Sequence, residues 1–155
     1  MDDNITPAGT NRRIARRIGS TARGVCLARS LTVRQLDLWG FPPRTPLSEN
    51  AALVVSELAT NAVVHGGDGI PGGDFHLRLE LPGRRGPLRV EVDDVAGDRL
   101  PAPGPARSPG EWEESGRGLV LVAAVALGCG VIRRGSGKTV WAELAVVPVP
   151  ERSPA

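Results

Sequence analysis

Glu57 and Asn61 stand four residues apart in the segment SELATNAVVHG, residues 56–66, and His65 follows after another four. This spacing places the three side chains on one face of a helix. A carboxylate can accept protons and hydrogen bonds, but burying one is costly unless a partner offsets its charge. The stripe therefore either faces water, as in an amphipathic surface helix, or lines a site whose ligand is that partner. Its small neighbours and few charges argue against a solvated face.

Asp93 and Asp94 form a second candidate, because they end the alternating segment LRVEVDD and precede small residues. Ligands are often bound where strands open into loops. A carboxylate accepts hydrogen bonds and donates none, so it would accept one from the exocyclic amine of adenine and repel the carbonyl oxygen of guanine. The alternative is a surface turn that carries two solvated aspartates.

The glycine-rich segment SGRGLVLV holds a third candidate at Gly116, Arg117 and Gly118. Glycines ahead of a helix let backbone N–H groups approach an anion, and an arginine can pair with a phosphate. A plain turn would explain the same residues. The later Gly-Lys-Thr at 137–139 is not a Walker A loop, because it enters a strand-like segment and lacks the required upstream glycine.

Hydrophobic periodicity predicts the elements that position these residues, and Gly and Pro mark their ends. We expect Ser20 or Thr21 to cap the first helix, and Ser48 to cap the second, which ends at residues 66–67. The expected elements are a strand at 12–19, helices at 20–40 and 49–65, strands at 75–81 and 88–94, a helix at 116–128, and two strands within 130–146.

This order of elements predicts an α/β (α+β) two-layer sandwich, with helices on one face of a mixed, mostly antiparallel sheet. Residues 95–115 are rich in proline, glycine and alanine and show no apolar period. A loop of that length inside a compact domain is usually functional or disordered.

The chain has 155 residues and a formal net charge of +2, which suit one folded domain and do not favour a nucleic-acid or membrane binder. The basic segment at 11–23 could touch a polyanion, but the chain offers no aromatic stacking platform. Cys26 and Cys129 are far apart, so reduced thiols are expected and a zinc site is not. The polar N-terminus and the short apolar segment at 118–132 predict a cytoplasmic protein without a signal peptide or membrane span.

The order and spacing of these motifs resemble the GHKL superfamily of ATPases and kinases, whose ATP site is the Bergerat fold. The segments ELATNAVVHG, GRGL and GKTVWAEL look most like the small anti-sigma-factor serine/threonine kinases, in particular the stand-alone ATP-binding regulators of actinobacteria. The resemblance covers residues 12–147, which are the expected histidine-kinase-like ATPase domain. Residues 1–11 and 148–155 are expected to be flexible ends.

The resemblance implies a role for each candidate residue. Glu57 matches the general base, Asn61 the Mg²⁺ ligand, and Asp94 the aspartate that receives the adenine amine. Thr139 matches the threonine that helps to hold that aspartate and a water, and residues 95–115 match the ATP lid. His65 either caps its helix or lines the site. The glycine box at the phosphates corresponds to Gly116, Arg117, Gly118 and Leu119.

This sequence departs from the family's Asp-x-Gly-x-Gly pattern. It reads DVAGD at residues 94–98, with Ala96 and Asp98 at the two glycine positions. Gly97 lies between them and stays among the nucleotide-binding candidates. Two explanations remain open. Either the register slips by one residue and Asp93 is the adenine ligand, or the loop follows a different path.

The expected cofactors are therefore ATP and Mg²⁺. The resemblance implies a kinase that phosphorylates a serine or threonine of an anti-anti-sigma factor and also binds a sigma factor. The chain could form a homodimer, but the sequence does not fix the oligomeric state. The alternative is a module without kinase activity, which binds ATP or no nucleotide and acts only by sequestering its partner. The altered glycine positions favour this alternative.

Overall fold

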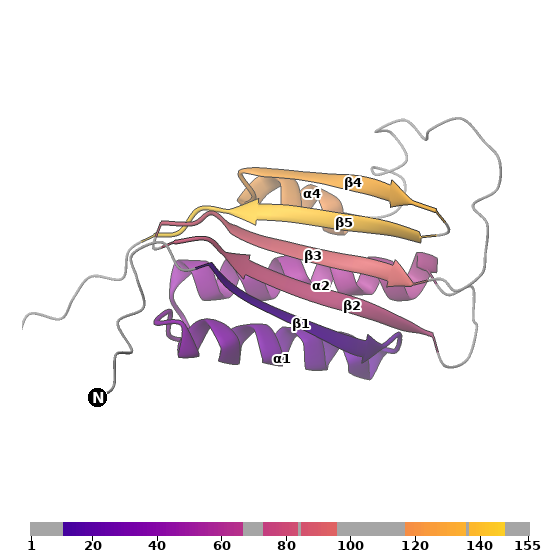
Figure 1. Ribbon diagram of the computed structural model, residues 1–155, viewed down its shortest axis with the longest axis horizontal. Coiled ribbons are helices and arrows are strands. Elements are labelled where there is room, and N and C mark those ends of the chain that lie inside the picture. The colour runs from indigo at the N-terminus through magenta and orange to yellow at the C-terminus, as the bar shows by residue number, and fades with distance from the viewer. Residues whose placement is uncertain (1–10, 67–72, 84, 96–116, 136, 148–155) are drawn as a thin grey trace, which may run out of the picture.

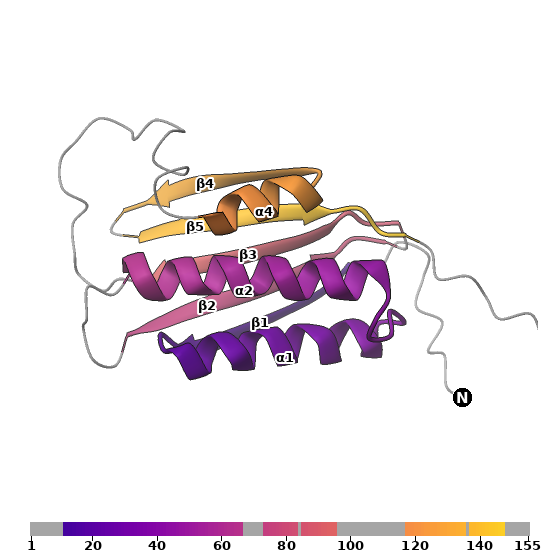
Figure 2. The same ribbon diagram turned by 180° about the vertical axis from the view of Figure 1, so that it is seen from behind.

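The computed structural model describes residues 11–66, 73–83, 85–95, 117–135 and 137–147. Helices cover one face of a five-stranded sheet, as Figures 1 and 2 show from opposite sides. The elements in chain order are β1 (Arg12–Gly19), α1 (Ala22–Leu38), α2 (Pro46–Gly66), β2 (Asp74–Leu81), β3 (Leu88–Val95), α4 (Arg117–Val125), β4 (Gly128–Arg134) and β5 (Gly137–Leu144).

The strands lie side by side in the order β1-β2-β3-β5-β4, so β3 is central and β1 and β4 are the two edges. All four pairings between the described strands are antiparallel. The expected two-layer sandwich with a mostly antiparallel sheet is confirmed. The helix α2 lies over β3 and β5 and packs between α1 and α4.

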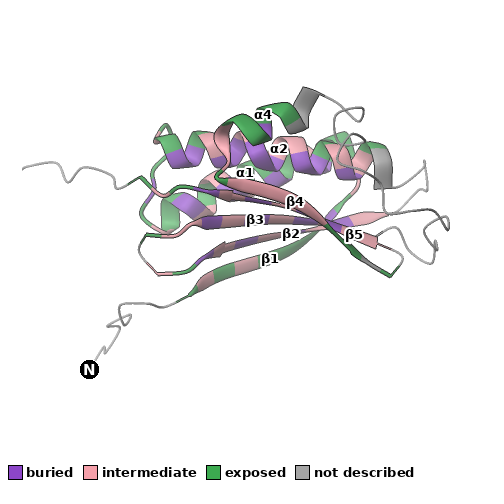
Figure 3. Cartoon of the chain, turned by 90° about the horizontal axis from the view of Figure 1, so that it is seen from above, coloured by how far each residue is buried: buried purple, intermediate pink, exposed green. Residues whose placement is uncertain are grey.

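The core lies between the sheet and the helix layer, and strand alternation selects its residues. On β3, Leu88, Val90 and Val92 are buried under the helices, whereas Arg89 and Glu91 face the other side of the sheet. Figure 3 shows buried residues concentrated where the helices meet the strands. The largest fully buried side chains are Phe75, Leu36, Leu47, Leu58, Leu77, Leu79, Leu81, Leu88, Leu144, Val54, Val55 and Val90.

The chain turns sharply from β1 into α1, and Gly24 makes that turn possible. Thr21, rather than Ser20, caps α1: its side chain accepts a hydrogen bond from the N–H of Gly24 at 2.9 Å. A Cβ atom on Gly24 would stand 1.9 Å from the carbonyl oxygen of Gly19, which is a backbone atom and cannot rotate away. The first turn of α1 therefore needs a glycine at this position.

We expect Gly24→Ala to lower the free energy of unfolding by about 1–3 kcal/mol, because the added methyl forces the β1–α1 turn apart. Urea unfolding followed by circular dichroism measures the change. Gly19→Ala is the matched control, since its Cβ would meet nothing within 4 Å. Equal stability of the two variants would show that the turn relaxes without cost.

The prediction that Ser48 caps the second helix is wrong, because α2 already begins at Pro46. The fixed φ of proline suits the first helical position, where a backbone N–H has no partner in any case. The N–H of Glu49 donates to the carbonyl of Thr45 at 3.0 Å, so helical hydrogen bonding starts ahead of Ser48. Ser48 is instead a buried residue inside the first turn.

Candidate functional site

The described candidate residues lie towards one end of the molecule. α2 and β3 finish at this end, β5 and α4 begin at it, and Figures 1 and 2 show the four termini there. α2 also contacts β3, β5 and α4. Asn61 on the later turns of α2 and Asp94 near the end of β3 are thereby brought to the same end of the fold.

Glu57 and Asn61 lie on α2 at the boundary between its buried and exposed faces. Both are partly exposed, while the adjacent Leu58 and Ala62 are buried in the core. The Oδ1 atom of Asn61 is itself buried, and no group within the described residues donates a hydrogen bond to it. An unsatisfied buried acceptor typically costs about 1–3 kcal/mol. A bound ligand at this atom would explain why the fold tolerates that cost.

The Oδ1 atom of Asn61, which has no hydrogen-bond donor among the described residues, is chemically suited to the expected role of a Mg²⁺ ligand. Mg²⁺ prefers oxygen donors, keeps several waters, and is usually held by one or two side chains together with substrate phosphates. In the described part of the chain, no cluster of three or more His, Cys, Asp and Glu residues could hold a metal ion alone. Asn61 is therefore suited to contribute one oxygen to a cation that arrives with a phosphate ligand.

Asp94 lies on the helix-facing side of β3, because it continues the alternation of the buried positions 88, 90 and 92. Its register partners are the buried Phe75 on β2 and Lys138 on β5. Burial raises the pKa of the Asp94 carboxyl above its ordinary value, and the charge of Lys138 acts in the opposite direction. Asp94 is thus a half-buried acceptor on the same side of the sheet as α2.

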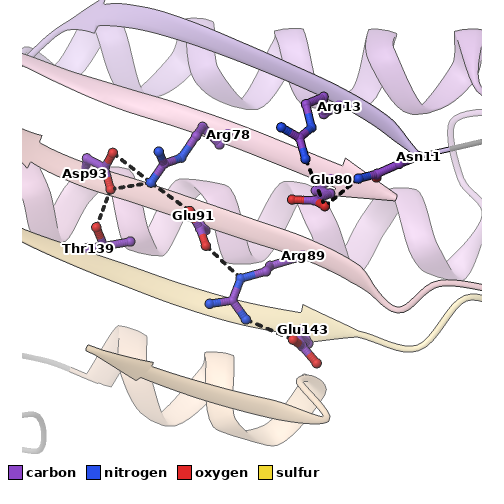
Figure 4. A network of polar contacts seen from close by, with 9 residues as sticks. All are labelled: Asn11, Arg13, Arg78, Glu80, Arg89, Glu91, Asp93, Thr139 and Glu143. Atoms are coloured by element: carbon purple, nitrogen blue, oxygen red, sulfur yellow. Dashed lines mark hydrogen bonds and ion pairs between the residues drawn. The ribbon is translucent and has the colours of Figure 1, made fainter. Parts of the chain in front are cut away.

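Asp93 points to the opposite, open face of the sheet, where its carboxylate is already engaged (Figure 4). Its Oδ1 accepts hydrogen bonds from Arg78 at 3.0 Å and from the hydroxyl of Thr139 at 2.5 Å. Residues 93 and 139 are register partners and so share a face. Thr139 therefore contacts Asp93, and not Asp94 as the resemblance implies. Of the two aspartates, Asp94 lies on the side of the sheet that carries α2, and which of them receives the adenine amine stays a prediction.

A chain of ion pairs continues from Asp93 across the open face (Figure 4). Arg78 contacts Glu91 at 2.7 Å, and Arg89 contacts Glu91 at 2.7 Å and Glu143 at 2.9 Å. Burial alone would raise the pKa of Glu91, but its hydrogen bonds and the charges of both arginines together lower it. These contacts tie β2, β3 and β5 together behind Asp94. Sequence reasoning missed them, because only the register shows which charges meet.

Several sequence-predicted candidates lie partly or wholly outside the described residues. Arg117 opens α4, and Gly118 and Leu119 continue its first turn, so the backbone places all three at the site end. The side chains of Arg117 and Leu119, and that of His65 at the end of α2, are not described. Gly97, Gly116 and all but the first residue of the expected lid at 95–115 fall within residues 96–116, which are not described.

The sequence pattern of the Histidine kinase-like ATPase domain matches residues 16–144, which is most of the chain. The chain belongs to this family. As a histidine kinase-like ATPase domain of the GHKL superfamily, it carries the fold of an ATP-binding protein, and domains of this superfamily typically bind ATP with Mg²⁺. No curated protein matches the sequence. No helix in the described part of the chain is long and apolar enough to cross a membrane.

We expect Asn61→Ala to weaken the Mg²⁺-dependent binding of ATP by about tenfold or more, which corresponds to about 1.4 kcal/mol. The reason is that the variant lacks the one buried side-chain oxygen on α2 that has no protein partner in the described structure. Calorimetric titration with and without Mg²⁺ measures the effect. Asn50→Ala, on the same helix, is the control and should bind like wild type. A loss of affinity that is identical without Mg²⁺ would contradict the metal-ligand role.

Proposed function

We propose that this histidine kinase-like ATPase domain is a protein serine/threonine kinase of the anti-sigma-factor type. It transfers the γ-phosphoryl group of ATP to a hydroxyl of an anti-anti-sigma partner, and it also sequesters a sigma factor. The observation that carries the proposal is that Glu57 lies one helical turn before Asn61, whose buried side-chain oxygen has no partner among the described residues. A base and a metal-directed oxygen on one helix face suit phosphoryl transfer, which depends on positioning and charge neutralisation.

Each residue has a separate task in this mechanism. Asp94 accepts a hydrogen bond from the adenine amine, and the N-terminus of α4 directs backbone N–H groups towards the phosphates. Asn61 would hold Mg²⁺ through its side-chain oxygen, and the ion would supply positive charge against the phosphates. Glu57 takes the proton of the partner's hydroxyl group while the oxygen of that hydroxyl group bonds to the γ-phosphorus. The bond between the γ-phosphorus and the bridging oxygen breaks, and ADP leaves.

A second candidate function rests on the altered glycine pattern. Ala96 and Asp98 occupy positions at which the family has glycine, and Cβ atoms there restrict backbone conformation and the approach of a ligand. A domain weakened in this way would bind ATP, or no nucleotide, and act only by sequestering its partner. Its partner affinity would then not depend on phosphorylation.

Incubation of the purified chain with γ-labelled ATP, Mg²⁺ and candidate anti-anti-sigma proteins tests the proposal. The kinase predicts a labelled partner, with the label on serine or threonine after acid hydrolysis and no label when the acceptor is changed to alanine. A protein that binds ATP and binds a partner but leaves it unlabelled would support the second candidate instead. A protein that binds no nucleotide would remove the first candidate altogether.

A further inference from the structure

Lys138 stands beside Asp94 on the helix-facing side of the sheet. Its register partner on β3 is Asp94, and it continues the alternation of the buried β5 positions 140, 142 and 144. Side chains directly opposite on antiparallel strands have Cβ atoms about 4.5–5.5 Å apart. Both residues are partly buried, and the charge of Lys138 opposes the rise in pKa that burial causes at Asp94. The ammonium is therefore close enough to act on the carboxyl.

Thr139, which the resemblance assigns to the adenine-binding aspartate, is turned away from Asp94. Its hydroxyl donates to Asp93 on the open face of the sheet, and its side chain is buried (Figure 4). The register thus brings Lys138 of β5, and not Thr139, next to Asp94. An ammonium differs from a hydroxyl because it carries three donors, a positive charge and no acceptor. On the helix-facing side, these two strands therefore present a charged acceptor and a charged donor side by side.

We propose that Lys138 is a second base-reading residue of this site, whose ammonium donates a hydrogen bond to the ring nitrogen N1 of adenine. The inference rests on the proposed function, in which Asp94 accepts a hydrogen bond from the adenine amine. That amine is bonded to C6, the ring atom next to N1, so adenine presents a donor and an acceptor on neighbouring atoms. Asp94 and Lys138, on neighbouring strands, present the matching acceptor and donor.

The pair would read two atoms of the base, whereas a carboxylate alone reads one. At the same two positions, guanine carries a carbonyl oxygen on C6 and an N–H at N1. Asp94 would then face an acceptor and Lys138 a donor, so both contacts would be lost together. A hydrogen bond to a charged group is typically worth about tenfold or more in affinity. Lys138 therefore adds to the preference for ATP over GTP that Asp94 alone would give.

ATP and its analogue 1-deaza-ATP, in which a C–H group replaces N1, test the proposal by calorimetric titration. Wild type should bind ATP about tenfold or more tightly than 1-deaza-ATP. In Lys138→Met this ratio should fall to within about threefold, because methionine keeps an unbranched side chain without a donor. Loss of the Lys138 charge also acts on the Asp94 carboxyl, but that effect is common to both nucleotides and leaves the ratio unchanged.

Arg133→Met is the matched control. Arg133 is exposed on β4 and is the register partner of Lys138 on the side away from Asp94. Its loss removes one positive charge from the same face of the sheet. The affinities for the two nucleotides should therefore fall equally or not at all, and their ratio should stay at the wild-type value. Lys138→Gln keeps a neutral donor and should give a ratio between those of wild type and Lys138→Met.

A wild type that binds ATP and 1-deaza-ATP equally would overturn the proposal, and this comparison does not depend on any variant folding. So would a ratio that Lys138→Met leaves unchanged, or one that Arg133→Met abolishes as well. These outcomes leave ATP binding intact and so spare the proposed function. Failure of the wild type to bind ATP at all would instead remove the proposed function and this inference together.

Discussion

Replacing Glu57 with glutamine is expected to slow phosphorylation of the partner by about 10²–10⁴-fold, the usual contribution of a general base. Glutamine keeps the size and shape of the side chain but cannot take the proton of the attacking hydroxyl. Affinity for ATP should stay within about twofold of wild type, because the proposed role of Glu57 begins only at the chemical step. Single-turnover labelling of the partner, together with an ATP titration, separates the two quantities.

Glu49→Gln is the control for this substitution, since Glu49 is exposed in the first turn of the same helix. It should leave both the labelling rate and the ATP affinity unchanged. If Glu57→Gln instead lowers the melting temperature by many degrees, Glu57 is a structural residue of α2 and the catalytic assignment is wrong. A folded Glu57→Gln variant that labels its partner at the wild-type rate would also contradict the catalytic assignment of Glu57.

Replacing Asp94 with asparagine is expected to weaken ATP binding by about ten- to a hundredfold, because a hydrogen bond to a charged acceptor contributes about 1.5–3 kcal/mol. The same change should reduce the preference for ATP over GTP, since asparagine can also donate to the guanine carbonyl. Asp93→Asn is the comparison. It should bind ATP normally but unfold more easily, because Asp93 accepts hydrogen bonds from Arg78 and Thr139.

The raised pKa of Asp94 gives this prediction a pH dependence. The ionised form binds the adenine amine, so ATP affinity should fall as the pH is lowered through that raised pKa. The effect on folding has the opposite sign. A carboxyl with a raised pKa in the folded state contributes stability below its unfolded pKa, and this contribution is lost as the pH rises through the folded value.

At neutral pH, Asp94→Asn should therefore leave the free energy of unfolding unchanged or raise it, while ATP affinity falls. Lys138→Met tests the cause, because loss of its charge should raise the pKa of Asp94 further and shift the loss of ATP binding to higher pH. Carboxyl titration by NMR measures this pKa directly. An Asp94→Asn variant that is clearly destabilised at neutral pH would point to a structural role for the carboxylate.

Hydrophobic alternation was enough to predict most of the fold. The buried residues of β2 and β3 recur at every second position, and that period distinguishes a strand from a helix whatever the partners are. The sequence does not predict the start of α2, because serine is a good cap in general, whereas here the preceding Pro46 already fits the first helical position. Local preference gives the element, but competing local signals decide its boundary.

The candidate site was predictable in its residue types but not in its geometry. Sequence spacing placed Glu57 and Asn61 on one helix face, yet it could not choose between Asp93 and Asp94, which differ only in the side of the sheet they occupy. The register places the two on opposite faces, because it pairs Asp93 with Thr139 and Asp94 with Lys138. The role of Asp94 as the adenine ligand stays a prediction. The sequence assigns no role to Lys138. The triplet Gly-Lys-Thr at 137–139 suggests a phosphate-binding loop, and only the register shows that Lys138 lies beside Asp94 of β3.

The central claim is that α2 and the end of β3 hold ATP through Asn61 and Asp94, and a nucleotide titration of the wild-type chain tests it most directly. Calorimetry with ATP and GTP, each with and without Mg²⁺, covers both contacts in one experiment. The account predicts saturable binding of ATP that strengthens with Mg²⁺, and GTP affinity lower by about tenfold or more. Equal binding of ATP and GTP would contradict the role of Asp94, and no binding of either at millimolar concentration would contradict the site itself.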